Sequence, residues 1–209
     1  MKTVLWDWNG TLLDDVHTCI DAMNIILNRR KLPLLTSEIY RQIFTFPVFD
    51  YYEKLGFNFT SDPFEKLAEE YLLEYDSLVQ KAALFPGAAD TLSHLHSKGY
   101  SQIILSAMRQ TDLLCQVKTA GISSWFQDIL GLKDIYAKSK IENAIQYIGK
   151  HNLKSDDICM IGDTDHDYEV SKALGCRCIL IKNGHQHLEC QFTGNVEILN
   201  SIVDVSRYL

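Results

Sequence analysis

Short apolar runs alternate with amphipathic stretches along most of this chain. The first run, residues 4–6, predicts a buried strand that ends at Asp7 and is followed by a turn at Gly10 and Thr11. An acid at the C-terminal end of a strand lies where open α/β sheets bind ligands. The simpler interpretation is that Asp7 only caps a turn.

A helical pattern fills the next part of the chain. Residues 19–27 repeat apolar positions at helical spacing, with Asp14 or Asp15 as a helix cap. Residues 36–84 also keep a helical pattern, with Pro63 at a plausible helix start. This stretch is too long for a simple crossover and predicts an inserted helical subdomain.

From residue 88 onward, predicted strands and helices alternate. The predicted strands cover 102–105, 128–132, 157–161 and 177–181, and the predicted helices cover 88–98, 110–119, 139–151, 165–174 and 198–208. Nearly continuous apolar strands separated by helices are typical of a parallel sheet covered on both faces. We therefore expect an α/β fold with a doubly wound parallel sheet and an inserted α-helical domain.

Composition narrows the function classes. The 209 residues are 46% hydrophobic and 22% charged, as in an ordinary folded protein, and the net charge of −7 argues against a nucleic-acid partner. No apolar run reaches the ~20 residues of a membrane span, and the N-terminus leaves no room for a signal peptide. We expect a cytoplasmic protein with no membrane partner; its oligomeric state is not readable from the sequence.

Cysteine spacing predicts reduced thiols. None of the six cysteines has C-x-x-C spacing, and Cys159, Cys176 and Cys178 fall in apolar, strand-like runs. There a buried thiol behaves as a small hydrophobic group, which is favoured over disulfides or a metal site.

Polar groups follow several of the predicted strands. Asp163 and Asp167 lie in G-D-T-D-H-D after residue 161, Ser106 follows residue 105, and Lys140 opens a helix. In a parallel sheet these groups reach the same edge as Asp7. Crowded carboxylates raise one another's pKa unless a cation neutralises them, and Mg²⁺ prefers such oxygen ligands.

The cation at this edge is expected to be Mg²⁺ and not zinc, with an anion site opposite it. Zinc fits poorly, because His166 has no second imidazole at ligand spacing. Ser106, nearby turn N–H groups such as that of Ala107, and Lys140 outline a site for a phosphate group opposite the cation.

Taken singly, each residue has a simpler explanation. Ser106 is typical of a turn, Lys140 of a solvated helix start, and Asp165 of a helix N-cap, while His185 and His187 look like loop histidines. The candidate site depends on the coincidence of compatible groups at successive strand ends.

That order of motifs resembles the haloacid dehalogenase (HAD) superfamily over essentially the whole chain. D-W-N-G-T at residues 7–11 is similar to the first motif, D-x-D-x-T, and G-D-T-D-H-D at residues 162–167 to the fourth, G-D-x-x-x-D. Ser106 resembles the second motif and Lys140 the third, with Lys138 as an alternative. The helical insertion resembles the cap of the phosphoglycolate phosphatase and phosphoglucomutase branch.

The resemblance implies a Mg²⁺-dependent phosphatase that hydrolyses a small phosphorylated metabolite through an aspartyl-phosphate on Asp7. It implies a core of residues 1–15 and 84–209 and a cap of residues 16–83. It assigns the metal to Asp7, the main-chain carbonyl of Asn9, Asp163 and Asp167, and the phosphate to Thr11, Ser106, Ala107 and Lys140. Lys140 would also restrain the nucleophile.

Asn9 departs from the family pattern, which has an aspartate there as general acid and base. An amide cannot transfer a proton, and losing such help typically costs about 10²- to 10⁴-fold in rate. The enzyme is then a slow phosphatase, favours good leaving groups such as acyl or aryl phosphates, or uses another base, for which His166 or a cap residue are candidates.

Other reactions stay open at this point. Phosphonate cleavage would need a cap lysine, for which Lys54 is the candidate, and a phosphate-binding or regulatory module needs no chemistry at all. The Asp163 and Asp167 pair argues against dehalogenation, which uses no metal. The cap residues that face either the cleft or the core are Tyr40, Arg41, Phe44, Phe46, Tyr51 and Tyr52; helical spacing favours the core.

Overall fold

The computed structural model describes residues 2–133, 140–188 and 192–209. Within these residues the main sheet has six strands in the order β5-β4-β1-β6-β7-β8, and every neighbouring pair is parallel. The strands are β1 (Thr3–Trp6), β4 (Ser101–Arg109), β5 (Asp128–Leu132), β6 (Ile158–Gly162), β7 (Arg177–Ile181) and β8 (Val196–Leu199). The expected doubly wound α/β fold is confirmed.

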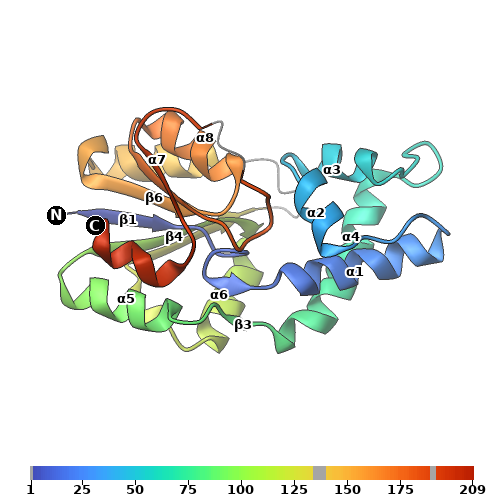
Figure 1. Cartoon of the computed structure of the whole chain (residues 1–209), viewed down its shortest axis with the longest axis horizontal. Helices are drawn as coiled ribbons and strands as arrows, with labels where there is room; N and C mark the ends of the chain where they lie inside the picture. Colours follow the sequence, from blue (N-terminus) through green and yellow to red (C-terminus); the bar gives the residue numbers. More distant parts are fainter. Residues whose placement is uncertain (1, 134–139, 189–191) are drawn as a thin grey trace.

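Helices cover both faces of this sheet (Figure 1). One face carries α5 (Ala88–Ser97) and α6 (Gln110–Thr119), and the other α7 (Ile141–His151) and α8 (Asp165–Leu174). Alternation along β1 explains both layers: Leu5 packs in the cluster with Ala144 and Val170, whereas Val4 and Trp6 face the cluster that contains Leu92.

Helices between two short strands form a separate lobe, here called the helical insertion (Figure 1, right). The chain leaves through β2 (Leu13–Asp14) and returns through β3 (Ala83–Leu84), which pair antiparallel. The insertion contains α1 (Val16–Arg29), α2 (Ser37–Ile43), α3 (Val48–Lys54) and α4 (Phe64–Leu78), followed by a short 3₁₀ helix at Val79–Lys81. Its apolar side chains continue the cluster beneath β1, so the lobe is packed onto the sheet edge.

The end of the chain differs from its prediction. Residues 196–199 form β8, which pairs with β7, and only Ile202–Arg207 are helical, as a 3₁₀ helix. The helix predicted over residues 198–208 is wrong at its start, because β7 has an edge whose hydrogen-bonding groups would otherwise be unpaired, and this edge favours a strand at residues 196–199. Shorter 3₁₀ helices occupy Ser123–Trp125 and Ser155–Asp157.

Other features concern the thiols and membrane insertion. Cys19, Cys115, Cys159, Cys176 and Cys178 are free thiols, and Cys190 lies outside the described residues. In the part of the chain that the structure describes, no helix combines the length and the apolar character needed to cross a membrane.

Candidate active site

The carboxyl ends of the two central strands bring Asp7 and Asp163 together. β1 and β6 are neighbours, and the N–H of Asp7 donates to the carbonyl of Ile161 at 2.8 Å. Asp167 follows in the first turn of α8, and oxygens of these three carboxylates lie within 4.8 Å of one another. All three side chains are buried. The structure thus brings together the acids that the sequence placed at this edge.

Lys140 is the buried cation of this cluster. Its Nζ pairs with Oδ1 of Asp7, lies 2.7 Å from Oδ1 of Asp167 and donates to the carbonyl of Leu105 at 3.2 Å. Burial alone would lower the pKa of Lys140, but the charges of Asp167 and Asp7 outweigh it and raise this pKa. The ammonium therefore stays protonated and holds the Asp7 carboxylate in place. Lys138, the alternative, lies outside the described residues.

The acids are electrostatically strained without a further cation. Burial raises the pKa of Asp7 to about 8 and that of Asp163 to about 6. Burial would also raise the pKa of Asp167, but Lys140 outweighs it and lowers this pKa. If all three were ionised, the carboxylates facing one ammonium would leave two negative charges in excess. The all-oxygen donor set and this excess charge fit Mg²⁺, which Asp7, Asp163 and Asp167 would hold.

Glycines let the backbone approach these acids. A Cβ on Gly162 would lie 2.0 Å from Cγ of Asp167, and a Cβ on Gly184 would lie 2.0 Å from Oδ2 of Asp163. Asp167 Oδ2 also accepts from the N–H and the hydroxyl of Thr164, at 3.0 and 2.7 Å. Thr164, not Asp165, is the N-cap of α8, because Thr164 and Asp167 form a capping box.

The predicted phosphate-binding residues divide into two groups. Ser106, Ala107 and Lys140 line the cavity beside Asp7, whereas Thr11 donates its hydroxyl to Oδ1 of Asp163 at 2.8 Å and is absent from the described lining. The predicted strand ends at residue 105, before Ser106, but β4 continues to Arg109. Its register with β5 is irregular after Leu105. Ser106 Oγ accepts from the N–H of Met108 at 3.1 Å, as in the expected turn.

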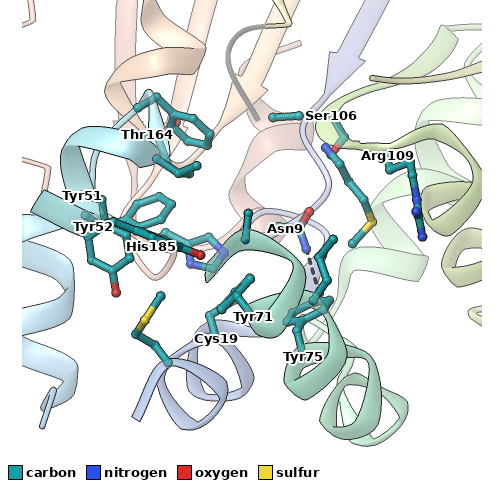
Figure 2. Close-up of a pocket in the computed structure, with 18 of the residues that line it drawn as sticks. Asn9, Cys19, Tyr51, Tyr52, Tyr71, Tyr75, Ser106, Arg109, Thr164 and His185 are labelled. Carbon is teal, nitrogen blue, oxygen red and sulfur yellow. Dashed lines mark hydrogen bonds between the residues drawn. The ribbon is translucent and has the colours of Figure 1, made fainter. Parts of the chain in front are cut away.

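Asn9 is held by the buried carboxylate of Asp15, one of the two residues that the sequence offers as a cap of the first helix. Its Nδ2 donates to Oδ2 of Asp15 at 2.7 Å. It also donates to the hydroxyl of Tyr75, in α4, at 3.0 Å (Figure 2). Asp15 is fully buried and also accepts from the N–H of Gly10 at 3.0 Å and from Tyr75 at 2.8 Å. Asp15 precedes α1, but its side chain makes no cap hydrogen bond there.

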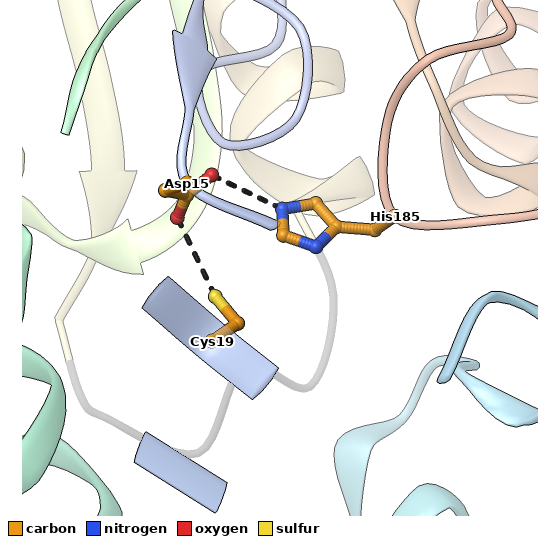
Figure 3. Close-up of side chains that lie close together, drawn as sticks. All are labelled: Asp15, Cys19 and His185. Carbon is orange, nitrogen blue, oxygen red and sulfur yellow. Dashed lines mark hydrogen bonds and ion pairs between the residues drawn. The ribbon is translucent and has the colours of Figure 1, made fainter. Parts of the chain in front are cut away.

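His185 completes this buried network. Its Nε2 lies 3.2 Å from Oδ1 of Asp15 (Figure 3), its Nδ1 is 2.7 Å from the hydroxyl of Tyr40, and its N–H donates to Asp163 at 2.6 Å. Burial would lower the pKa of His185, but Asp15 outweighs it and raises this pKa to about 9, so the ring is cationic at neutral pH. The sequence showed only a histidine in an N-G-H-Q-H loop; nothing in it signalled this contact. His187, by contrast, is exposed.

A cavity of about 160 Å³ lies between the sheet edge and the helical insertion. Figure 2 shows tyrosines of the insertion on one side of it and Ser106 and Arg109 on the other. Five residues of the helical insertion that could face either the cleft or the core line this cavity: Tyr40, Phe44, Phe46, Tyr51 and Tyr52. Arg41 instead donates to the carbonyl of Gly184 at 3.0 Å and ties α2 to the loop before His185.

Two candidate residues lie away from the described cavity lining. His166 Nε2 accepts from the N–H of Lys140 at 3.3 Å, and its Nδ1 is 3.3 Å from Glu169, so both ring nitrogens are engaged. Lys54 is exposed and donates to the carbonyl of Ile43 at 3.3 Å. Neither a His166 base nor a Lys54 Schiff base is supported by this geometry.

The comparisons with known proteins agree with the motifs. A phosphoglycolate phosphatase from Aliivibrio fischeri is 22% identical over 90% of this chain and 87% of its own length. The pyrophosphatase PpaX from Oceanobacillus iheyensis is 27% identical over 80% of this chain and 77% of its own length. A solved structure of a predicted phosphoglycolate phosphatase from Haemophilus somnus superposes with a TM-score of 0.83 at 19% identity, covering 100% of this chain and 97% of the other. The family model described as haloacid dehalogenase-like hydrolase matches residues 4–181, and the chain belongs to that family.

Proposed function

We propose that this protein is a Mg²⁺-dependent phosphatase that acts on a small phosphate monoester through an aspartyl-phosphate on Asp7. The observation that supports this best is the position of Asp7. Among the three clustered acids, Asp7 is the one in the described cavity lining, and Lys140 and Ser106 line the cavity beside it. Relatives named phosphoglycolate phosphatase support the reaction class. We also propose that residues 16–83 act as the cap and residues 1–15 and 84–209 as the core.

In this mechanism an oxygen of Asp7 attacks phosphorus while the bond to the leaving oxygen breaks. Lys140 and Ser106, with the N–H groups beside Ala107, hold the phosphoryl oxygens, and Lys140 keeps Asp7 aligned. Asp7, Asp163, Asp167 and the main-chain carbonyl of Asn9 would hold Mg²⁺, which would supply positive charge to the phosphoryl oxygens. Water then hydrolyses the aspartyl-phosphate and releases inorganic phosphate.

The test is release of phosphate from a panel of phosphate esters with Mg²⁺ and with a chelator. Asp7→Asn serves as the blank and should reduce release to background, because an amide is not a nucleophile toward phosphorus. Its melting temperature should equal or exceed that of the wild type, because the pKa of Asp7 is raised to about 8 and the substitution removes a desolvated charge.

Release that persists in Asp7→Asn, or that is unaffected by the chelator, would contradict the proposal. No release from any ester would favour the phosphate-binding or regulatory module instead.

A further inference from the structure

Beyond Asp7, the cavity wall is predominantly aromatic and apolar. The insertion contributes Phe44, Phe46, Tyr51, Tyr52, Tyr71 and Leu72, and the sheet edge contributes Met108. The rings also pack on one another: the centroids of Phe44 and Phe46 are 5.5 Å apart, and those of Phe44 and Tyr51 are 5.3 Å apart. Such a wall favours a flat apolar group, because aromatic pairs add about 0.5–1.5 kcal/mol beyond burial of their area.

The cations in the described lining are already neutralised. Lys140 pairs with Asp7 and Asp167, and His185 pairs with Asp15. Arg109 makes two hydrogen bonds to the carboxylate of Asp112, at 2.7 and 2.9 Å, and Asp112 lines the cavity as well.

Negative charge continues next to that pair. Burial and the charge of Asp112 raise the pKa of Asp76. A carboxylate or second phosphate on the leaving group would enter an apolar cavity without a free counter-charge, which is costly. The described part of the cavity therefore disfavours leaving groups that carry a second anion.

Asn9 limits the leaving group independently. Its amide is fixed by Asp15 and Tyr75 and has no proton to give to a departing oxygen. The leaving oxygen must then depart as an anion. Phenol has a pKa of about 10, as in the tyrosine side chain, whereas an alcohol is about as weak an acid as water, with a pKa of about 16. A phenolate can leave unassisted far more readily than an alkoxide.

We propose that the substrate is a small aryl phosphate monoester without a second anionic group. An Asp7 oxygen forms a bond to phosphorus, the P–O bond to the aryl group breaks, and its electron pair leaves on the phenolate, which takes a proton from water. Water then cleaves the aspartyl-phosphate and yields phosphate. This inference rests on the proposed phosphatase function and adds the class of its substrate.

The test separates the aromatic ring from the leaving-group effect with compounds at equal Mg²⁺. Phenyl phosphate has a ring and a good leaving group, benzyl phosphate a ring and a poor one, acetyl phosphate a good leaving group without a ring, and phosphoglycolate a poor leaving group and a second anion. We expect kcat/KM for phenyl phosphate to exceed that for phosphoglycolate by about 10²-fold or more. Benzyl phosphate should have a KM as low as that of phenyl phosphate but a lower kcat. Acetyl phosphate should have a higher KM than either of them.

The outcomes distinguish the two proposals. Metal-dependent release that vanishes in Asp7→Asn but is fastest with phosphoglycolate would leave the phosphatase function standing and overturn the aryl substrate. A kcat/KM for acetyl phosphate above that for phenyl phosphate would also overturn it, since leaving-group quality alone would then decide. No metal-dependent release from any compound would instead refute the phosphatase function itself.

A pair of substitutions on α4 tests the charge argument. Leu72 lines the cavity, whereas its neighbour Leu73 is 73% exposed and is not in the described lining. Leu72→Arg should raise kcat/KM for phosphoglycolate relative to phenyl phosphate by about tenfold, the effect of ~1.4 kcal/mol from a new counter-charge. Leu73→Arg should leave the ratio unchanged. If the ratio of kcat/KM for phosphoglycolate to that for phenyl phosphate is the same in both variants and the wild type, the charge argument is contradicted. Melting temperatures show whether each variant is folded. If Leu72→Arg does not fold, the comparison of the four compounds with the wild type decides.

Discussion

The pairing of Asn9 with Asp15 is the residue-scale feature that sets the chemistry of this site. The amide of Asn9 lies 2.7 Å from a carboxylate that is fully buried and also binds Tyr75 and His185. Burial would raise the pKa of Asp15, but His185 outweighs it and lowers this pKa. Asp15 is therefore charged and accepts the hydrogen bond that orients Asn9. The effect of a substitution at position 9 consequently depends on Asp15.

Asn9→Asp alone should gain little turnover on alkyl phosphates. The new carboxyl group would face Asp15 at hydrogen-bond distance, and two such groups share one proton instead of donating it. In Asn9→Asp/Asp15→Asn the carboxyl and the amide exchange places, and kcat for phosphoglycolate should rise by about tenfold or more above the wild type, part of the 10²- to 10⁴-fold of a general acid.

The four proteins, including Asp15→Asn, form a double-mutant cycle in kcat. If the change in kcat of the double variant equals the product of the changes in the two single variants, Asp15 does not control position 9.

At the scale of elements, ion pairs tie the helix that leaves the core to the helix that returns toward it. Arg29 is the last residue of α1 and binds Glu70 and Glu74 of α4 at 2.7 and 2.6 Å. Arg30, directly after α1, binds Asp62 at 2.7 Å and Glu70 at 2.8 Å. Hydrogen bonds from Arg30 lower the pKa of both Asp62 and Glu70. This network helps to hold α1 against α4, whose Tyr75 reaches Asn9.

Arg30→Gln should lower the free energy of unfolding by about 1 kcal/mol at pH 7, the upper range for partly exposed pairs. The folded pKa values of Asp62 and Glu70 are lowered, so this stability is present above their unfolded values of about 4 and is lost as the pH falls through the folded values. The difference between variant and wild type should therefore shrink toward pH 3, as measured by urea unfolding.

Lys31→Gln is the matched control, because it removes the neighbouring charge and Lys31 has no ion pair among those described. A difference that stays constant down to pH 3 would assign the effect of Arg30 to packing of its side chain.

At the scale of the whole molecule, the candidate active site lies where two lobes meet. Tyr40 and Arg41 of α2 contact the loop at residues 184–185, and Gln186 donates to the carbonyl of Phe44 at 2.9 Å. Beneath this contact lie the crowded acids from β1, β6 and α8. Binding of a cation there should stabilise the fold as a whole, since the acids lie at the carboxyl ends of the two central strands.

Mg²⁺ should raise the melting temperature of the wild type and not that of Asp163→Asn. Saturation at 100 times the dissociation constant corresponds to about 2.7 kcal/mol of added stability. In a chelator Asp163→Asn should be at least as stable as the wild type, because burial raises the pKa of Asp163 to about 6 and the amide removes that desolvated charge. The measurement is the melting temperature of both proteins with and without Mg²⁺. An equal rise in both would rule out Asp163 as a ligand.

The sequence by itself determined the sheet and the acids at its edge. Apolar runs separated by helices predict a parallel sheet, and in such a sheet Asp7, Asp163, Ser106 and Lys140 must reach the same edge, where the structure places them. These inferences need only local periodicity and the common direction of the strands. The helix predicted over residues 198–208 is wrong at Ile198 and Leu199, because an edge strand is decided by its neighbour β7 and not by its own pattern.

Only the tertiary structure decided which groups control Asn9 and which line the cavity. The sequence indicates Asp14 or Asp15 as a helix cap and His185 as a loop histidine. In the structure Asp15 and His185 meet at 3.2 Å across 170 residues of chain, because β7 and β1 lie in one sheet with β6 between them. The aromatic residues of the insertion likewise have the helical spacing that is typical of core residues, and yet they line the cavity. Helical periodicity specifies a buried face, and it cannot specify whether that face meets packed side chains or a substrate.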